Sequence, residues 1–237
     1  MAVDDAFTIA LLHMDGTDAS TTFTDESGKT WTANADAQLD TAQYKFGSAS
    51  GLFDSVGDYV DTGDSSDFDF GTGDWTVDFW IRRNGTVAYP GIISTPVYTA
   101  GSGWFIGLGN STNKFYIGWD GVAKINGTTV VADTTWTHGA VVRYGNSVKL
   151  YVDGTLDVSG TDDCTGDSID SDAGGAVIGR LFIDNDGFYY SGWTDEVRVS
   201  KGVARWTANF TPPTAPYAPA ESNTGPQITY LSDYGLI

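Results

Sequence analysis

Apolar and polar side chains alternate along several short stretches of the chain with a period of two residues. The stretch DWTVDFWIRR, residues 74–83, has this pattern most clearly. One face of the predicted strand carries Trp75, Val77, Phe79 and Ile81, and the other carries Thr76, Asp78, Trp80 and Arg82. Because successive side chains of an extended strand point to opposite faces, this pattern predicts a half-buried β-strand. No segment has an apolar stripe of helical period over three turns, which argues against a helical fold.

Turn residues separate the predicted strands at short intervals. The segment GWFIGLGNSTNKFYIGWDG, residues 103–121, predicts a hairpin around Asn110–Asn113. Residues 136–160 predict two further turns, at Gly145-Asn146 and at Asp153-Gly154. An Asp-Gly pair readily adopts the two positive φ angles of a tight hairpin. We count about a dozen strands with turn signals every 8–12 residues or so, which is typical of a β-sandwich or barrel.

The composition changes after Phe210, where a stretch rich in Pro, Ala and Ser begins that cannot pair in a central strand. We therefore predict a sandwich domain over residues 1–211, followed by a Pro-rich linker and a short extended arm over residues 212–237. The arm ends in the β-prone segment QITYLSDYGLI. Addition of this segment to the sheet of a neighbouring molecule and a frayed terminus are both open interpretations. The residues expected to dock are Gln227, Ile228, Tyr230, Leu231 and Tyr234.

The chain is strongly acidic, with a formal net charge of -19, and its acidic residues are 28 Asp and only 3 Glu. Such a field repels nucleic-acid phosphates and anionic lipid surfaces, so neither nucleic acid nor a membrane is an expected partner. The single cysteine, Cys164, excludes an intramolecular disulfide.

Several stretches of the chain resemble one protein family. They are LLHMDGTDASTTFTDESG, AQYKFGSASGLFDSVGDYV, DFDFGTGDWTVDFWIRR, TWTHGAVVRYGNSVKLYVDG and YYSGWTDEVRVSKGVARWTANFTPPTAPY. Together they resemble a concanavalin A-like lectin/glucanase domain of the laminin-G-like jelly-roll type. The first and last of them resemble the version found in tailed-phage virion proteins. The resemblance implies an all-β fold, a two-sheet antiparallel jelly-roll sandwich, but a fold alone does not choose a function.

What the resemblance implies about function is a non-enzymatic bacteriophage virion protein. We expect a capsid decoration protein or a tail-associated surface protein, assembled in the host cytoplasm and located on the virion surface. Its expected partners are the major capsid protein or other virion proteins, and further copies of itself in a homo-oligomer. The alternative is a carbohydrate-binding module, a lectin or adhesin, that recognises a host surface polysaccharide.

Glycan hydrolysis is not expected from this sequence. Glucanases of the superfamily use closely spaced carboxylates on one strand, because retaining hydrolysis needs two carboxyl groups about 5–5.5 Å apart. The three glutamates, Glu26, Glu196 and Glu221, lie far apart in the sequence.

Aromatic residues on polar strand faces and in loops are candidates for sugar binding, since lectin sites stack sugar rings on exposed aromatic side chains. Trp80, Tyr116 and Tyr151 fall on the more polar faces of their predicted strands, and Tyr89 and Tyr98 lie in a long connection. In a two-layer sandwich, an aromatic residue on the polar side can instead cover its neighbours.

The segment WTDEVRVS predicts a last strand whose alternation directs Asp195 toward the core, on one face with Trp193, Val197 and Val199. The same alternation directs Arg198 outward, and Lys201 and Arg205 follow in a loop. A buried carboxylate must be hydrogen-bonded or metal-bound.

Related jelly rolls hold a calcium ion between their first and last strands, so the resemblance suggests a Ca²⁺ site formed by Asp15, Asp18 and Asp195. The alternative is that Asp195 accepts backbone N–H groups and that Asp15 caps a turn.

Overall fold

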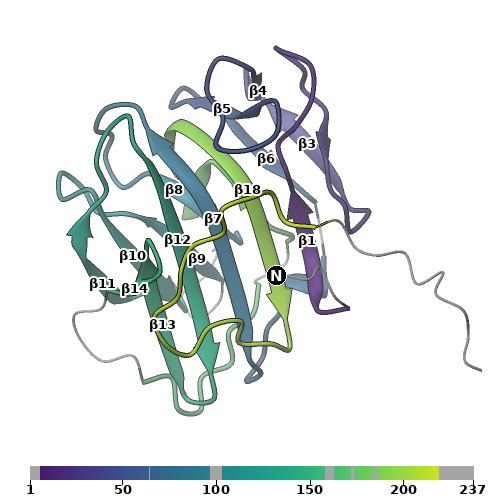
Figure 1. The fold of residues 1–237 in the computed structure, drawn as a ribbon. Helices are drawn as coiled ribbons and strands as arrows, with labels where there is room; N and C mark the ends of the chain where they lie inside the picture. The colour runs from purple at the N-terminus through teal and green to yellow at the C-terminus, as the bar shows by residue number, and fades with distance from the viewer. Residues whose placement is uncertain are drawn as a thin grey trace, which may run out of the picture.

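The computed structural model describes residues 6–63, 65–96, 103–157, 163–171, 174–183 and 186–218. Two large antiparallel sheets face each other in a sandwich (Figure 1). The described part also contains the 3₁₀ turn η1 (Ser66–Phe68), and none of its helices is long and apolar enough to cross a membrane. The predicted all-β, two-sheet antiparallel fold is confirmed.

The first sheet contains the first and last strands of the described chain. Its order is β14-β13-β12-β7-β18-β5-β4, and β1 also pairs with β18. The bounds are β1 (Thr8–Leu12), β4 (Gln38–Asp40), β5 (Ser50–Asp54), β7 (Trp75–Arg83), β12 (Trp136–Tyr144), β13 (Ser147–Val152), β14 (Thr155–Leu156) and β18 (Ser191–Lys201).

The second sheet has the order β11-β10-β9-β8-β15-β6-β3-β2. Its bounds are β2 (Phe23–Thr24), β3 (Thr30–Asn34), β6 (Tyr59–Asp61), β8 (Gly91–Ser94), β9 (Trp104–Leu108), β10 (Lys114–Trp119), β11 (Val122–Val130) and β15 (Val177–Ile178). A separate hairpin, β16 (Arg180–Ile183) and β17 (Asp186–Tyr189), follows β15 in the chain.

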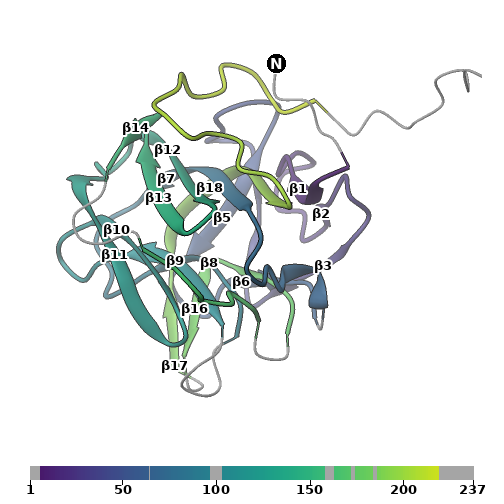
Figure 2. The same cartoon turned by 90° about the horizontal axis from the view of Figure 1, so that it is seen from below.

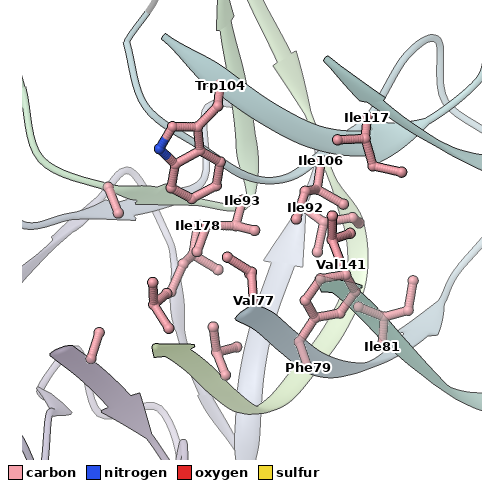
Figure 3. Packing of buried hydrophobic residues seen from close by; sticks show 14 of the residues in the cluster. Val77, Phe79, Ile81, Ile92, Ile93, Trp104, Ile106, Ile117, Val141 and Ile178 are labelled. Atoms are coloured by element: carbon pink, nitrogen blue, oxygen red, sulfur yellow. The ribbon is translucent and has the colours of Figure 1, made fainter. Parts of the chain in front are cut away.

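The inner faces of the two sheets form one hydrophobic core, as Figure 3 shows. Val77, Phe79 and Ile81 of β7 are fully buried, as the alternation in the sequence predicts. They face residues of the second sheet, and the rings of Phe79 and Phe115 lie 5.8 Å apart. Burying a side chain of this size contributes about 1.5–3 kcal/mol, so the core accounts for much of the stability of the sandwich.

The predicted hairpin turns are confirmed. β9 and β10 flank the turn at Asn110–Asn113, and β13 turns into β14 at Asp153-Gly154, where both residues have positive φ angles, 48° and 75°. A Cβ atom on Gly154 would lie 1.9 Å from the carbonyl oxygen of Phe210. Glycine is therefore required here both by the backbone conformation and by the close passage of the C-terminal segment.

A β-bulge in β18 reverses the alternation that the sequence predicts there. Asp195 pairs with Trp80 and Arg198 pairs with Asp78, so two residues of β18 oppose the single residue Phe79. Glu196, the first of the two, has a φ of 49°. Because directly opposed residues share a face, Asp195 lies on the outer face beside Trp80, and its predicted direction toward the core is wrong. Val197, the second of the two, points inward as predicted.

Residues 203–217, which we call the C-terminal strap, cross the outer face of the first sheet. In Figure 1 the yellow-green strap passes over β12, β7 and β18, and Figure 2 shows it on the side of the molecule opposite the hairpin β16–β17. Trp206 and Phe210 of the strap stack with their ring centroids 4.0 Å apart and pack against Tyr151. The strap therefore covers part of a sheet face that would otherwise meet solvent.

Candidate functional site

Tyr217 fixes the end of the C-terminal strap to the first sheet. It is only 3% exposed, its hydroxyl bonds to a carboxylate oxygen of Asp78, and its backbone N–H donates to Glu196 Oε2 at 2.8 Å. Glu196 also accepts a hydrogen bond from Nδ1 of His13 at 2.9 Å. Residues 212–218, which the sequence assigns to a linker, thus pack against the sandwich.

Asp78 and Arg198 form a buried ion pair beneath Tyr217. Nε and Nη2 of Arg198 each lie 3.0 Å from an oxygen of Asp78, and both side chains are fully buried. The guanidinium carbon of Arg198 lies 3.7 Å from the Tyr217 ring centroid. Burial alone raises the pKa of Asp78, but the charges and hydrogen bonds of Arg198 and His138 together outweigh burial and lower that pKa to about 2. Arg198 lies on the outer face as predicted, but the predicted exposure is wrong because the strap covers it.

Three of the five predicted sugar-binding aromatics are buried. Trp80 is 5% exposed, Tyr116 is 8% exposed and Tyr151 has no exposed surface. Their predicted exposure is wrong, because Trp80 lies under Lys45 and Phe46, Tyr151 under Phe210, and Tyr116 against Phe105 and Tyr89.

The other two aromatics differ in their placement. Tyr89 is 44% exposed, and its ring contacts Tyr116 and Phe188 edge-on with centroids 6.2 and 5.8 Å away. Tyr98 lies outside the described residues. The predicted docking residues Gln227, Ile228, Tyr230, Leu231 and Tyr234 also lie outside the described part of the chain.

The three predicted calcium ligands all bind N–H groups of the loop formed by residues 41–49. Oδ2 of Asp195 accepts the N–H groups of Lys45 and Phe46 at 2.6 and 3.1 Å. Asp15 accepts the N–H of Ser48 at 2.5 Å, and Asp18 accepts that of Thr41 at 3.1 Å.

Among the residues that the structure describes, no three His, Cys, Asp or Glu side chains converge to hold a metal ion. The calcium site expected at Asp15, Asp18 and Asp195 stays a prediction, and in the described structure each of these carboxylates accepts backbone N–H groups. The backbone-capping alternative describes Asp15 and Asp195 correctly.

A line of side chains crosses five strands on the part of the first sheet that lies beyond the strap. The register pairs Trp136 with Arg82, Arg82 with Trp193, Trp193 with Leu52, and Leu52 with Gln38. We call these five residues the transverse row. Each is half-buried, and all five share the outer face because each is directly opposed to the next. With neighbouring strands about 4.8 Å apart, the two indoles stand about 10 Å from each other.

The centre of the transverse row combines a cation with an aromatic ring. The guanidinium carbon of Arg82 lies 4.9 Å from the Trp193 ring centroid, and Trp193 Nε1 donates to Oδ2 of Asp40 at 2.6 Å. Nearby, the Lys45 ammonium lies 3.9 Å from the Trp80 ring centroid. The row thus offers apolar ring faces together with hydrogen-bonding groups.

The sequence does not reveal the transverse row. Uninterrupted alternation places Trp193 on the inner face, and the bulge at Glu196 reverses that assignment. Trp136 and Arg82 belong to strands far apart in the chain, and only their pairing brings them together. The polar face of β7, on which Arg82 follows Trp80, is the one signal that pointed to this surface.

Apart from the transverse row, the C-terminal strap itself encloses a hollow with a volume of about 730 Å³. It is lined by Arg198, by residues 203–206 and by residues 211–218. Its lining is rich in proline, and it lies beside the buried Asp78–Arg198 pair.

A family model matches residues 53–207, more than half of the chain, and it is described as the concanavalin A-like lectin/glucanases superfamily. The chain belongs to this superfamily. No curated protein matches the sequence of this lectin/glucanase-superfamily chain.

Solved structures share the fold of this superfamily member. Domain 4 of AbnA, a GH43 extracellular arabinanase from Geobacillus stearothermophilus, in complex with arabinotriose, has a TM-score of 0.60 and 16% identity, over 85% of this chain and 95% of that one. The binding domain of botulinum neurotoxin DC in complex with rat synaptotagmin II has a TM-score of 0.59 and 18% identity, over 83% and 49%. A Trypanosoma rangeli sialidase has a TM-score of 0.58 and 12% identity, over 85% and 32%.

The chain thus spans nearly all of the arabinanase domain, about half of the toxin binding domain and about a third of the sialidase. At these identities the likeness concerns the fold alone. Any function must be argued from the site itself.

Proposed function

We propose that this chain is a non-catalytic saccharide-binding module and that its ligand lies along the transverse row. The observation that carries this proposal is the alignment of Trp136, Arg82 and Trp193 on the part of a sheet face that the C-terminal strap leaves uncovered. The arabinotriose complex of the structurally similar arabinanase domain is a supporting precedent for this fold.

The chemistry of the row suits a sugar chain. The apolar C–H face of a sugar ring packs on an indole, while side-chain amides, carboxylates and guanidinium groups bond to its hydroxyls. Here Gln38 and Arg82 belong to the row, and Asp40 contacts Trp193. Two indoles about 10 Å apart suit an extended oligosaccharide better than a single sugar.

The module is proposed to bind without hydrolysis. The transverse row itself contains no carboxylate, and Asp40 already accepts the N–H of Ala42 as well as that of Trp193. Retaining hydrolysis needs a pair of carboxyl groups about 5–5.5 Å apart around the bond that is cleaved.

Replacing Trp136 by alanine is expected to weaken oligosaccharide binding about tenfold, because a stacked ring face is lost and roughly 1.4 kcal/mol corresponds to a factor of ten. A glycan array identifies the bound oligosaccharide, and calorimetry measures its affinity. Tyr89→Ala is the matched control, since Tyr89 is an exposed aromatic residue near the hairpin β16–β17. Equal losses in both variants, or no saccharide bound at all, would contradict the proposal.

We further propose that the module is carried on a bacteriophage virion, as a head decoration or tail-associated protein. The support is the resemblance of its closing motif, residues 194–217, to virion proteins, and that motif forms the end of β18 and the C-terminal strap. Detection of the chain on purified particles by mass spectrometry and immunogold labelling is the expected result. Its absence from particles contradicts this placement without affecting saccharide binding.

We propose that the C-terminal arm attaches the module to the virion. Deleting residues 227–237 is expected to reduce the number of copies per particle, because the arm is proposed to add a strand to a capsid or tail protein. Undiminished copy number would remove this role from the arm.

A further inference from the structure

The guanidinium of Arg82 has no acceptor among the residues that the structure describes. In the part of the chain that the structure describes, it makes no hydrogen bond or ion pair, and its guanidinium carbon lies 4.9 Å from the Trp193 ring centroid. Two other arginines differ in this respect: Arg83 bonds to the carbonyl of Val131 and pairs with Asp133, and Arg143 bonds to carbonyl oxygens of Gly71 and Asp167. A chain of net charge -19 offers many carboxylates, yet none of those in the described residues pairs with Arg82.

We propose that the saccharide on the transverse row is acidic, and that the carboxylate of a uronate or sialate unit pairs with Arg82. This inference rests on the proposed saccharide-binding function and names its ligand class. The planar guanidinium presents two parallel N–H donors that match the two oxygens of a carboxylate. Stacking against Trp193 restrains the guanidinium plane, so less side-chain freedom is lost when the ligand binds.

A second cation lies on the same face. The ammonium of Lys45 lies 3.9 Å from the ring centroid of Trp80 and makes no hydrogen bond or ion pair within the described residues. Trp80 and Arg82 are alternate residues of β7, so their Cα atoms are about 7 Å apart. Two cations without acceptors, each held over an indole, therefore lie next to one another on this face.

Neighbouring carboxylates do not neutralise these cations. Asp40 accepts the N–H groups of Trp193 and Ala42, and Asp195 accepts the backbone N–H groups of Lys45 and Phe46. Burial raises the pKa of Asp195 to about 8, so it is largely uncharged at neutral pH. An arriving carboxylate thus meets two cations, and the oxygens of the nearby Asp40 are already hydrogen-bonded.

The experiment compares the affinities of matched ligands for the full-length protein. A glycan array carries oligosaccharides that contain uronate or sialate, together with their carboxyl-reduced or asialo counterparts. Calorimetry then measures the affinity for oligogalacturonate and its carboxyl-reduced form, or for sialyllactose and lactose. We expect at least tenfold tighter binding of the acidic member of one pair, with a dissociation constant that rises as salt is added. Which pair responds distinguishes a uronate from a sialate.

Arg82→Gln tests the assignment to this residue, because it keeps a polar side chain of similar reach and removes the charge. We expect it to abolish the preference for the acidic ligand while Arg82→Lys retains part of it. Lys124→Gln is the matched control, since Lys124 is an exposed cation 5.6 Å from the Trp119 ring centroid on the second sheet. This control variant is expected to keep the preference of the wild-type protein.

The possible outcomes separate this inference from the function on which it rests. Tighter binding of neutral ligands, or an acidic preference that persists in Arg82→Gln, overturns the assignment and leaves saccharide binding standing. Binding of neither class overturns both.

Discussion

Replacing Asp78 by asparagine is expected to lower the free energy of unfolding by about 3–5 kcal/mol, because it removes the carboxylate that pairs with the buried charge of Arg198. Both residues are fully buried, and the carboxylate also bonds to the Tyr217 hydroxyl that holds the C-terminal strap. In a protein of this size the loss corresponds to a decrease in melting temperature of about 10 °C. Urea unfolding followed by circular dichroism measures it.

Asp67→Asn is the control for this change. Asp67 pairs with Lys29 at 2.9 Å, but more than half of its side-chain surface is exposed, so its loss is expected to cost less than about 1 kcal/mol. If Asp78→Asn costs no more than this surface change, the buried pair does not hold the strap.

The same pair predicts a dependence of stability on pH. The folded-state pKa of Asp78 is lowered to about 2, below its unfolded value near 4. The stability it contributes is therefore present above about pH 4 and is lost as the pH falls toward 2, by about 2–3 kcal/mol. Asp78→Asn is expected to lack this contribution to acid sensitivity.

Replacing Asp195 by asparagine is expected to have the opposite effect and to stabilise the protein at pH 7 by about 2–4 kcal/mol. Burial raises the pKa of Asp195 to about 8, although the N–H groups of Phe46 and Lys45 act to lower it, and Oδ1 has no hydrogen-bond partner. At pH 7 the folded protein must therefore bind a proton that the unfolded chain does not hold. Asparagine accepts the same two N–H groups without that cost.

The pH dependence of the gain in stability distinguishes the loss of proton uptake at Asp195 from an improvement in packing. In the wild-type protein the contribution of Asp195 is fully present below about pH 4 and is lost as the pH rises to about 8, so the advantage of asparagine grows over that range. Unfolding in urea at pH 5, 7 and 9 measures it. Asp15→Asn is the control, since Asp15 also accepts backbone N–H groups but lies at an exposed position. A gain that is equal at all three pH values would contradict the assignment.

Local patterns were sufficient to predict the architecture. The alternation in β7 predicted its buried face correctly, and the Asp153-Gly154 turn has the expected pair of positive φ angles. Both depend on the intrinsic geometry of an extended chain and of a two-residue turn, which adjacent residues determine. The patterns left a sandwich and a barrel open, and the family resemblance added the choice of a two-sheet sandwich.

The site was less predictable because it depends on contacts between distant residues. Trp80 and Tyr151 lie on polar strand faces, as predicted, but the loop of residues 41–49 and the strap cover them. Trp193 and Asp195 were assigned to the wrong face because no local signal marks the bulge at Glu196. Trp136, Arg82 and Trp193 become neighbours only through pairing across β12, β7 and β18.

The sequence by itself determined that this protein is an antiparallel β-sandwich with an aromatic core, because alternation and turn residues act within a few positions of the chain. Only the tertiary structure decided which polar-face residues remain exposed. That outcome depends on where a one-residue bulge shifts the register and on which segment, here residues 203–217, returns to cover the sheet. The transverse row follows from both of these long-range features.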